Sequence, residues 1–183
     1  TAQMPGTAQP VPSMAELSVE HKRLYEAFSQ SDLDAEPDQT LQLAERIRQV
    51  QAQILARANE LPPAEQAELK GLRLEHVNVL KWLADRYQKR DLAKCSGCWN
   101  SMLVQVQTVH GENHWMTRTV RNEMGRVELL KRLPPVDQTD LAESERLHYR
   151  ALELQRQGEC HQACDTARAA LKIRQSILPP GHS

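Results

Sequence analysis

The sequence predicts an all-α protein in which antiparallel helix hairpins stack into a short solenoid or bundle. Its 183 residues are dominated by the helix formers Ala, Leu, Glu, Gln and Arg, while aromatic residues make up only 4%. Apolar residues recur at helical spacing in seven successive segments with short connections, which places neighbouring helices antiparallel. No segment alternates apolar and polar residues beside a hairpin turn, so no sheet is expected.

The first helix is expected to follow an uncharged stretch. Residues 1–12 hold Thr, Gln, Pro and Gly and little apolar surface, which predicts a flexible leader. Ser13 is followed by Glu16 at the spacing of a capping box, in which each side chain bonds the backbone N–H of the other residue. Apolar residues then recur at helical spacing at Met14, Leu17, Leu24 and Phe28.

The second helix is expected from about Asp38 to Leu61. Residues 29–37 are mostly polar and end in Pro, which favours a break, and Pro62–Pro63 ends the second segment. One face of the segment carries Leu43, Ile47, Val50, Ile54 and Leu61. We assign residues 13–63 to N-terminal helices that cap the array formed by residues 64–183.

Five further helices are expected in this array. They run from about Ala64 to Arg90, Leu92 to Val109, Asn113 to Leu133, Thr139 to Gln157 and Glu159 to Leu178. The predicted inward positions are Leu69, Leu72, Leu80, Leu83, Tyr87, Met116, Val120, Met124, Val127, Leu147, Ala151, Leu154, Ala163, Ala167, Ala170 and Leu171. Pro134–Pro135 and Pro179–Pro180 are read as stops after the third and the last of these helices.

Two stretches of the array align with each other when His114 is placed on His182, a shift of 68 residues. The aligned pairs are Cys95 with Ala163, Trp99 with Ala167, Met102 with Ala170 and Leu103 with Leu171. After a gap of one residue, Leu80 meets Leu147, Ala84 meets Ala151 and Tyr87 meets Leu154. The alignment indicates an internal repeat of one helix hairpin.

This hairpin resembles the tetratricopeptide repeat in its long, kinesin-light-chain-like form, as in large bacterial proteins of the kind abundant in planctomycetes. The second copy places Leu147, Ala151, Leu154, Gly158, Ala163, Ala167, Ala170 and Pro179 on or near signature positions. The first copy departs from the family at its turn, where Arg90 runs straight into Asp91 without a glycine. The resemblance covers about residues 70–183 and implies paired helices with small residues at their crossings.

The resemblance also implies a scaffold that binds a protein or peptide partner and is part of a larger repeat protein. Stacked hairpins leave a concave groove lined by their first helices, and helical phase places Lys81, Asp85, Arg146 and Arg150 there. We expect no enzyme, because neither a Gly-rich phosphate loop nor a Gly-x-Ser-x-Gly elbow occurs. We therefore expect no catalytic residue and no bound cofactor, apart from the zinc considered next.

The four cysteines lie in two close pairs, Cys95 with Cys98 and Cys160 with Cys164. Such pairs on two turns are how zinc is clamped, so four thiolates, or three with His161, would make a structural zinc site. Alternatively, disulfides join the two regions, or the thiols occupy small packing positions, as the pairing of Cys95 with Ala163 suggests. We favour packing or a disulfide over zinc and keep all three interpretations.

The net charge, the hydropathy and the histidines of the sequence argue against other classes of function. A net charge of −1 without a run of Lys or Arg argues against nucleic-acid binding. No stretch approaches the roughly 20 apolar residues of a membrane span. The histidines at the repeat ends, His110, His114 and His182, are expected to pack and cap, and His21, His76 and His148 to be exposed or hydrogen-bonded. The compartment and the oligomeric state stay open.

Overall fold

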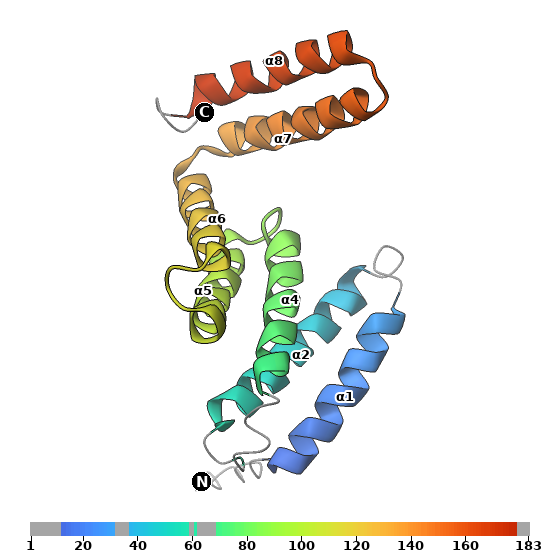
Figure 1. Ribbon diagram of the computed structural model, residues 1–183, viewed down its shortest axis with the longest axis vertical. Coiled ribbons are helices and arrows are strands. Elements are labelled where there is room, and N and C mark those ends of the chain that lie inside the picture. The colour runs from blue at the N-terminus through green and yellow to red at the C-terminus, as the bar shows by residue number, and fades with distance from the viewer. Residues whose placement is uncertain (1–11, 32–36, 59–60, 62–68, 179–183) are drawn as a thin grey trace, which may run out of the picture. The chain divides into compact units, whose positions relative to one another are not determined.

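In a computed structural model, the described residues are 12–31, 37–58, 61 and 69–178, and seven α-helices make up most of them. The helices are α1 (Met14–Gln30), α2 (Pro37–Ala56), α4 (Leu69–Tyr87), α5 (Leu92–His110), α6 (Trp115–Arg132), α7 (Pro135–Arg156) and α8 (Cys160–Ile177) (Figure 1). No strand occurs in these ranges, so the predicted all-α class is confirmed. Within the same ranges, no helix has the length and apolar character of a membrane span.

Two helix boundaries differ by four residues or more from those predicted. α2 ends at Ala56, five residues before the predicted Leu61. There the N–H of Arg57 is shared between the carbonyls of Gln53 and Ile54, at 3.3 and 3.2 Å, which tightens the last turn. α7 begins at Pro135, before the predicted Thr139. Proline is well tolerated at the first position of a helix, where its missing N–H is not needed, so this Pro-Pro pair starts a helix as well as ending one.

Some predicted features lie outside the described residues. These are the leader up to residue 11, the Pro62–Pro63 stop, the first residues of the third predicted helix and the Pro179–Pro180 end.

The capping box at the start of α1 is confirmed. The Ser13 hydroxyl accepts the backbone N–H of Glu16 at 3.3 Å, and the Glu16 carboxylate accepts the backbone N–H of Ser13 at 2.7 Å. Two N–H groups that have no partner within the helix are therefore satisfied.

Replacing Ser13 with Ala is expected to lower the free energy of unfolding by about 1 kcal/mol, because Ala cannot accept the Glu16 N–H. The measurement is urea denaturation of both proteins. Ser18→Ala is the matched control, since Ser18 is exposed in the interior of the same helix, where Ala is favoured. Equal stability of the Ser13 variant and the unchanged protein would contradict the prediction.

The chain divides into two compact units, Thr1–Val127 and Glu128–Ser183. In the first unit, α2 packs against α1 and α4, and α4 packs against α5. The core of this unit includes Leu17, Ala44, Ile47, Val50, Leu80, Leu83, Ala84, Cys95, Trp99, Met102, Val106, Val120 and Val127. Helical periodicity placed most of these residues on inward faces, so the core follows the predicted phase.

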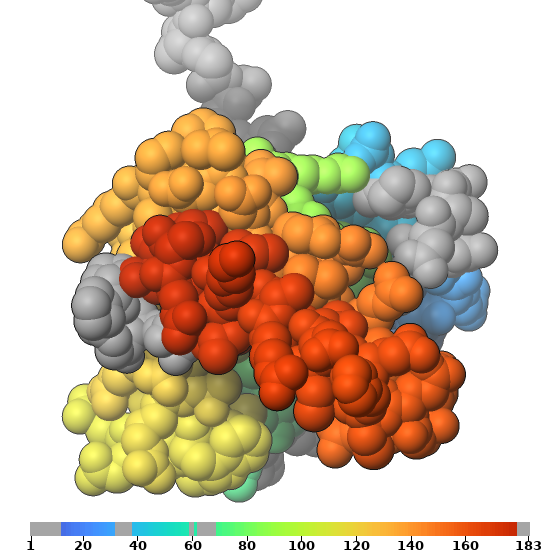
Figure 2. All heavy atoms as spheres, turned by 90° about the horizontal axis from the view of Figure 1, so that it is seen from above, coloured from blue at the N-terminus to red at the C-terminus, as the bar shows by residue number. Residues whose placement is uncertain are grey.

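In the second unit, α7 and α8 form one antiparallel hairpin, and their spheres adjoin in Figure 2. Gly158 ends α7 with φ of 82°, a conformation that favours glycine, and the N–H of the next residue returns to the Leu154 carbonyl at 2.9 Å. The buried side chains of this hairpin are small: Ser144, Ala151, Ala163 and Ala170. Small residues thus lie between the two helices, as the resemblance implied.

The two aligned hairpins bury matching positions. Ala84 and Ala151 are both buried, and so are Cys95 and Ala163, and Met102 and Ala170. The other four aligned pairs differ. Leu80 and Tyr87 are buried, whereas Leu147 and Leu154 are half-buried, and Trp99 and Leu103 lie in or against the core, whereas Ala167 and Leu171 are exposed. The predicted inward placement of Ala167 and Leu171 is therefore wrong, and the two hairpins share buried positions at three of the seven aligned pairs.

Replacing Ala170 with Leu is expected to destabilise the α7–α8 hairpin by about 1–3 kcal/mol, because the added carbons do not fit where two helices are in contact. Ala170 is 3% exposed. Ala167→Leu is the matched control, since Ala167 lies on the same helix and is exposed. Hydrogen exchange of the α7 and α8 amides measures the loss, and equal protection in the two variants would count against close packing at Ala170.

Candidate functional site

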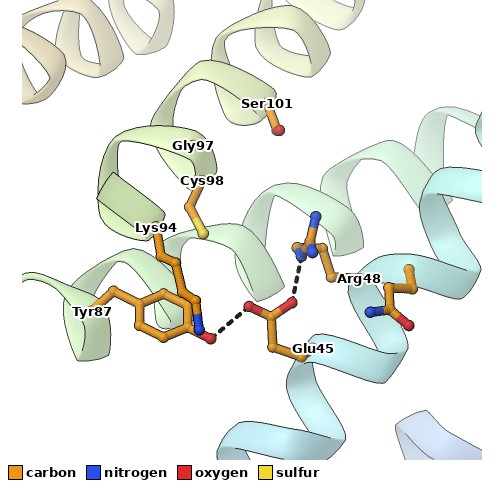
Figure 3. Close-up of a pocket in the computed structure, with 8 residues that line it drawn as sticks. Glu45, Arg48, Tyr87, Lys94, Gly97, Cys98 and Ser101 are labelled. Carbon is orange, nitrogen blue, oxygen red and sulfur yellow. Dashed lines mark hydrogen bonds and ion pairs between the residues drawn. The ribbon is translucent and has the colours of Figure 1, made fainter. Parts of the chain in front are cut away.

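The candidate site is a hollow of about 550 Å³ in the first unit, between α2 and α5 and beside the end of α4 (Figure 3). Its lining consists of Glu45, Arg48 and Gln49 from α2, Tyr87 from α4, and Lys94, Gly97, Cys98 and Ser101 from α5. Counted from Glu45 on α2 and from Lys94 on α5, the other lining residues follow at three, four or seven positions, so each set lies on one face of its helix. Tyr87 is the last residue of α4 and reaches the hollow from its end.

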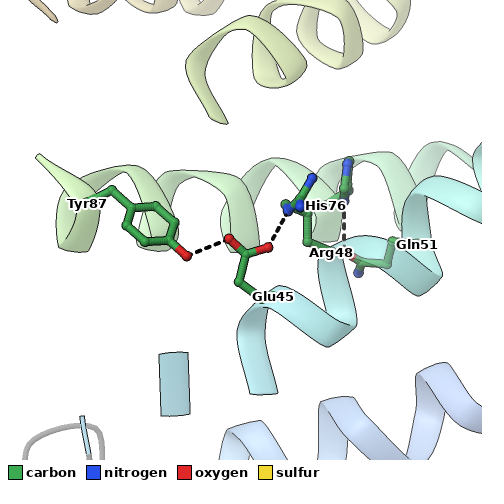
Figure 4. Close-up of polar contacts among 5 residues, drawn as sticks. All are labelled: Glu45, Arg48, Gln51, His76 and Tyr87. Atoms are coloured by element: carbon green, nitrogen blue, oxygen red, sulfur yellow. Dashed lines mark hydrogen bonds and ion pairs between the residues drawn. The ribbon is translucent and has the colours of Figure 1, made fainter. Parts of the chain in front are cut away.

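Glu45 is the centre of the polar contacts in the hollow (Figure 4). One carboxylate oxygen accepts the Tyr87 hydroxyl at 2.6 Å, and the other accepts the Arg48 Nε–H at 2.7 Å. The Lys94 ammonium lies 5.2 Å from the centre of the Tyr87 ring, within the range of a cation–π contact. These contacts tie α2 to the end of α4 and bring a lysine from α5 beside them.

Two acidic groups of the hollow keep their protons at neutral pH. Burial raises the pKa of the Tyr87 phenol well above its usual value, and its hydrogen bond to Glu45 raises it further. Burial also raises the pKa of the Cys98 thiol to about 11, with a contribution from the Glu45 charge. Cys98 is therefore a thiol, which is a weak nucleophile and a poor metal ligand.

The four cysteines differ in their environments. Cys95 and Cys98 are buried in the core of the first unit, whereas Cys160 and Cys164 are exposed on α8. None of them forms a disulfide. Within the described ranges, no group of three or more His, Cys, Asp or Glu side chains is placed to hold a metal ion. The burial of Cys95 and Cys98 agrees with the interpretation that these thiols occupy small packing positions. The zinc site stays a prediction.

The residues predicted to line a groove do not line this hollow. Lys81 and Asp85 form an ion pair with each other at 2.9 Å, and Arg146 binds Glu143 at 2.7 Å. Arg150 is exposed on α7. The hollow is lined mainly by α2 and α5, which are the second helices of their hairpins, whereas the prediction placed the groove on the first helices.

The histidines at the end of α5 pack as expected. His110 and His114 stack with ring centres 4.4 Å apart, and His114 accepts the Met116 N–H near the start of α6 at 3.3 Å. His182, the third of this set, lies outside the described residues.

A buried polar chain lies behind the hollow, also in the first unit. His76, which is 2% exposed, donates from Nδ1 to the Gln51 side-chain oxygen at 2.9 Å (Figure 4). Gln51 in turn donates to His21 Nε2 at 3.0 Å, and that nitrogen lies 3.6 Å from the Glu75 carboxylate. Burial, together with the positive charges of Arg48 and Arg73, lowers the pKa of His76 to about 4, so His76 is neutral at pH 7.

Fold and site together define an all-α protein of packed helix hairpins, with a hollow lined by residues of α2, α4 and α5. Comparison with models of protein families, with curated proteins and with solved structures finds no match.

Proposed function

We propose that this chain is a scaffold of the tetratricopeptide type that binds a segment of a partner protein in the hollow between α2 and α5. The observation that carries the proposal is the hollow itself. Its volume of about 550 Å³ lies within the range of roughly 300–1,000 Å³ that is usual for ligand sites. Its walls are helices, which hold the side chains in fixed positions without help from a ligand.

The side chains in the hollow are of the kinds that dominate protein recognition. Tyr87 and Arg48 belong to the residue types most often found at energetic hot spots of interfaces. Tyr87 is only 5% exposed and is held by Glu45, so little conformational entropy is lost when a partner contacts it.

The chemistry of the hollow favours binding over catalysis. Cys98 and Tyr87 both have raised pKa values and stay protonated, so neither is poised as a nucleophile or base at neutral pH. His76 lies in the core behind the hollow and is bound to Gln51. We therefore propose affinity for a partner as the activity of this face.

Site-specific cross-linking tests the proposal. Ser101, on the α5 wall, is exchanged for the photoreactive residue benzoylphenylalanine, and exposed Ser18 on α1 is exchanged in a control protein. Each is irradiated in an extract of the cells that make this protein. We expect a protein to be captured from position 101 only, and to bind the unchanged chain saturably once it is purified. Equal capture from both positions, or a captured protein that does not bind when pure, contradicts the proposal.

A further inference from the structure

We infer that the hollow recognises a carboxylate of the partner segment, either an acidic side chain or the chain end, seated between Arg48 and Lys94. The inference rests on the proposed function and adds the chemistry of the bound group. It is carried by the balance of hydrogen-bond donors and acceptors in the hollow.

Part of the acceptor capacity of Glu45 is already engaged. Each of its two oxygens holds a short hydrogen bond, one from Tyr87 and one from Arg48. Its side chain is also only 24% exposed. A cationic group of a partner would therefore have to share this half-buried carboxylate with Tyr87 and Arg48. The single acidic residue of the hollow is a poor docking point for Lys or Arg of a ligand.

The hydrogen-bond donors of the hollow, in contrast, are only partly used by contacts within the protein. Arg48 uses Nε for Glu45, and no hydrogen bond from its two terminal nitrogens is found among the described residues. In the same part of the chain, no carboxylate lies within ion-pair distance of the Lys94 ammonium, whose one contact is the Tyr87 ring. Ser101 adds a hydroxyl to the same wall. The guanidinium fork and the ammonium are the two donors that bind carboxylates most strongly.

The charge of the hollow matches a monoanion. Arg48 and Lys94 carry two positive charges and Glu45 one negative charge, which leaves one positive charge. One carboxylate neutralises this excess, whereas a phosphate group, with a charge near −2, exceeds it. The buried Tyr87 and Cys98 nearby lower the local polarity, which strengthens the attraction compared with an open surface.

The α5 wall also leaves room for a ligand. Gly97 faces the hollow from the middle of α5, and a Cβ added there would meet no atom within 4 Å. The first carbon of a larger side chain therefore meets no clash within the protein, and we expect the rest of that side chain to fill part of the hollow. Gly97→Leu should fold well, because Leu favours helix over Gly. Gly125→Leu is the matched control, since Gly125 is exposed on α6, has the same open space and does not line the hollow.

The test selects binders from a random peptide library on the full chain and remakes them for titration by fluorescence anisotropy. Each peptide is made with a free or amidated C-terminus, with its Asp and Glu kept or changed to Asn and Gln, and with phosphoserine in place of one acidic residue. The protein variants are Lys94→Glu, with exposed Lys22→Glu as charge control, and the two glycine variants.

We expect the selected peptides to need a carboxylate, with the amidated and amide-substituted forms showing whether it is terminal or a side chain. Lys94→Glu should weaken binding at least about ten-fold, which is the usual size of a lost or reversed charge contact, and Lys22→Glu should leave it unchanged. Gly97→Leu should abolish binding and Gly125→Leu should preserve it.

The other outcomes separate this inference from the proposed function. Peptides blocked by Gly97→Leu that tolerate loss of every carboxylate overturn the inference but support binding in the hollow. Phosphoserine peptides that bind more than about ten-fold tighter assign the hollow to phosphate and also overturn it. Peptides that bind equally to all variants, or a library without binders, overturn both.

Discussion

Replacing Leu83 with Ala is expected to lower the free energy of unfolding of the first unit by about 2–5 kcal/mol. Leu83 is fully buried in the last third of α4, the helix that packs on both α2 and α5. Two effects contribute to this loss: less apolar surface is buried on folding, and a cavity remains where the Leu83 side chain was. The cavity remains because the helices packed on both sides of α4 cannot move together enough to fill it.

Urea denaturation followed by tryptophan fluorescence measures this loss in the first unit, because all three tryptophans, Trp82, Trp99 and Trp115, lie in it. Val104→Ala is the control: Val104 is 56% exposed on α5, so its truncation should change stability by less than about 0.5 kcal/mol. A loss of under about 1 kcal/mol for the Leu83 variant would mean that α4 is not enclosed by its neighbours.

The fold was predictable because a helix repeats its environment every three to four residues. Leu80, Leu83 and Tyr87 follow this period and are all buried. The same reasoning failed for Ala167 and Leu171, which continue the period of α8 but are exposed. Periodicity fixes which residues share a face of a helix, but the width of the covered face depends on how many helices pack against it.

The hollow could not be predicted from the sequence for a related reason. Glu45 and Arg48 are a helical turn apart and look like an ordinary solvated ion pair of α2. Their neighbours Lys94 and Cys98 lie about fifty residues further along the chain, and no local pattern states that these two faces meet. In the sequence, Cys98 stands out only through its spacing from Cys95. Nothing in the sequence around Lys94 and Tyr87 indicates that they share a site.

The hydrogen-bonded chain of buried polar residues behind the hollow could not be predicted from the sequence either. His76 occurs among apolar residues of α4, and the sequence leaves open whether such a histidine is exposed or hydrogen-bonded. The deciding residue is Gln51 on α2, which is itself fully buried and bonds both His76 and His21. A buried amide with two histidine partners is a property of the packing of α1, α2 and α4, and it has a measurable consequence for stability.

The first unit is expected to lose about 3 kcal/mol of stability through His76 as the pH falls from about 6.5 to about 4. The pKa of His76 is about 4 in the folded chain, against 6.5 when the imidazole is exposed to water. Between these values the unfolded chain binds a proton that the folded chain does not, so acid favours unfolding, and each unit of difference contributes about 1.4 kcal/mol. This stability is fully present above pH 6.5 and is lost by about pH 4.

The environment of His76 supports the direction of this effect. Its Nδ1 already donates to Gln51, and Arg48 and Arg73 nearby disfavour a second positive charge. His21 shifts in the same direction, because burial lowers its pKa more than the charge of Glu75 raises it. Protonation of His21 would also place an N–H against the amide N–H of Gln51, so both histidines oppose protonation of the folded state.

Acid also protonates carboxylates throughout the chain, so the measurement has to be a difference between variants. Urea denaturation at several pH values compares the unchanged protein with His76→Gln, which keeps an N–H donor for Gln51 but does not titrate. We expect the stability of this variant to change less between about pH 6.5 and pH 4, while His148→Gln, at an exposed position of α7, keeps the original dependence. Parallel curves for all three proteins would show that His76 is not held neutral, and that its contact with Gln51 is too weak to exclude a proton.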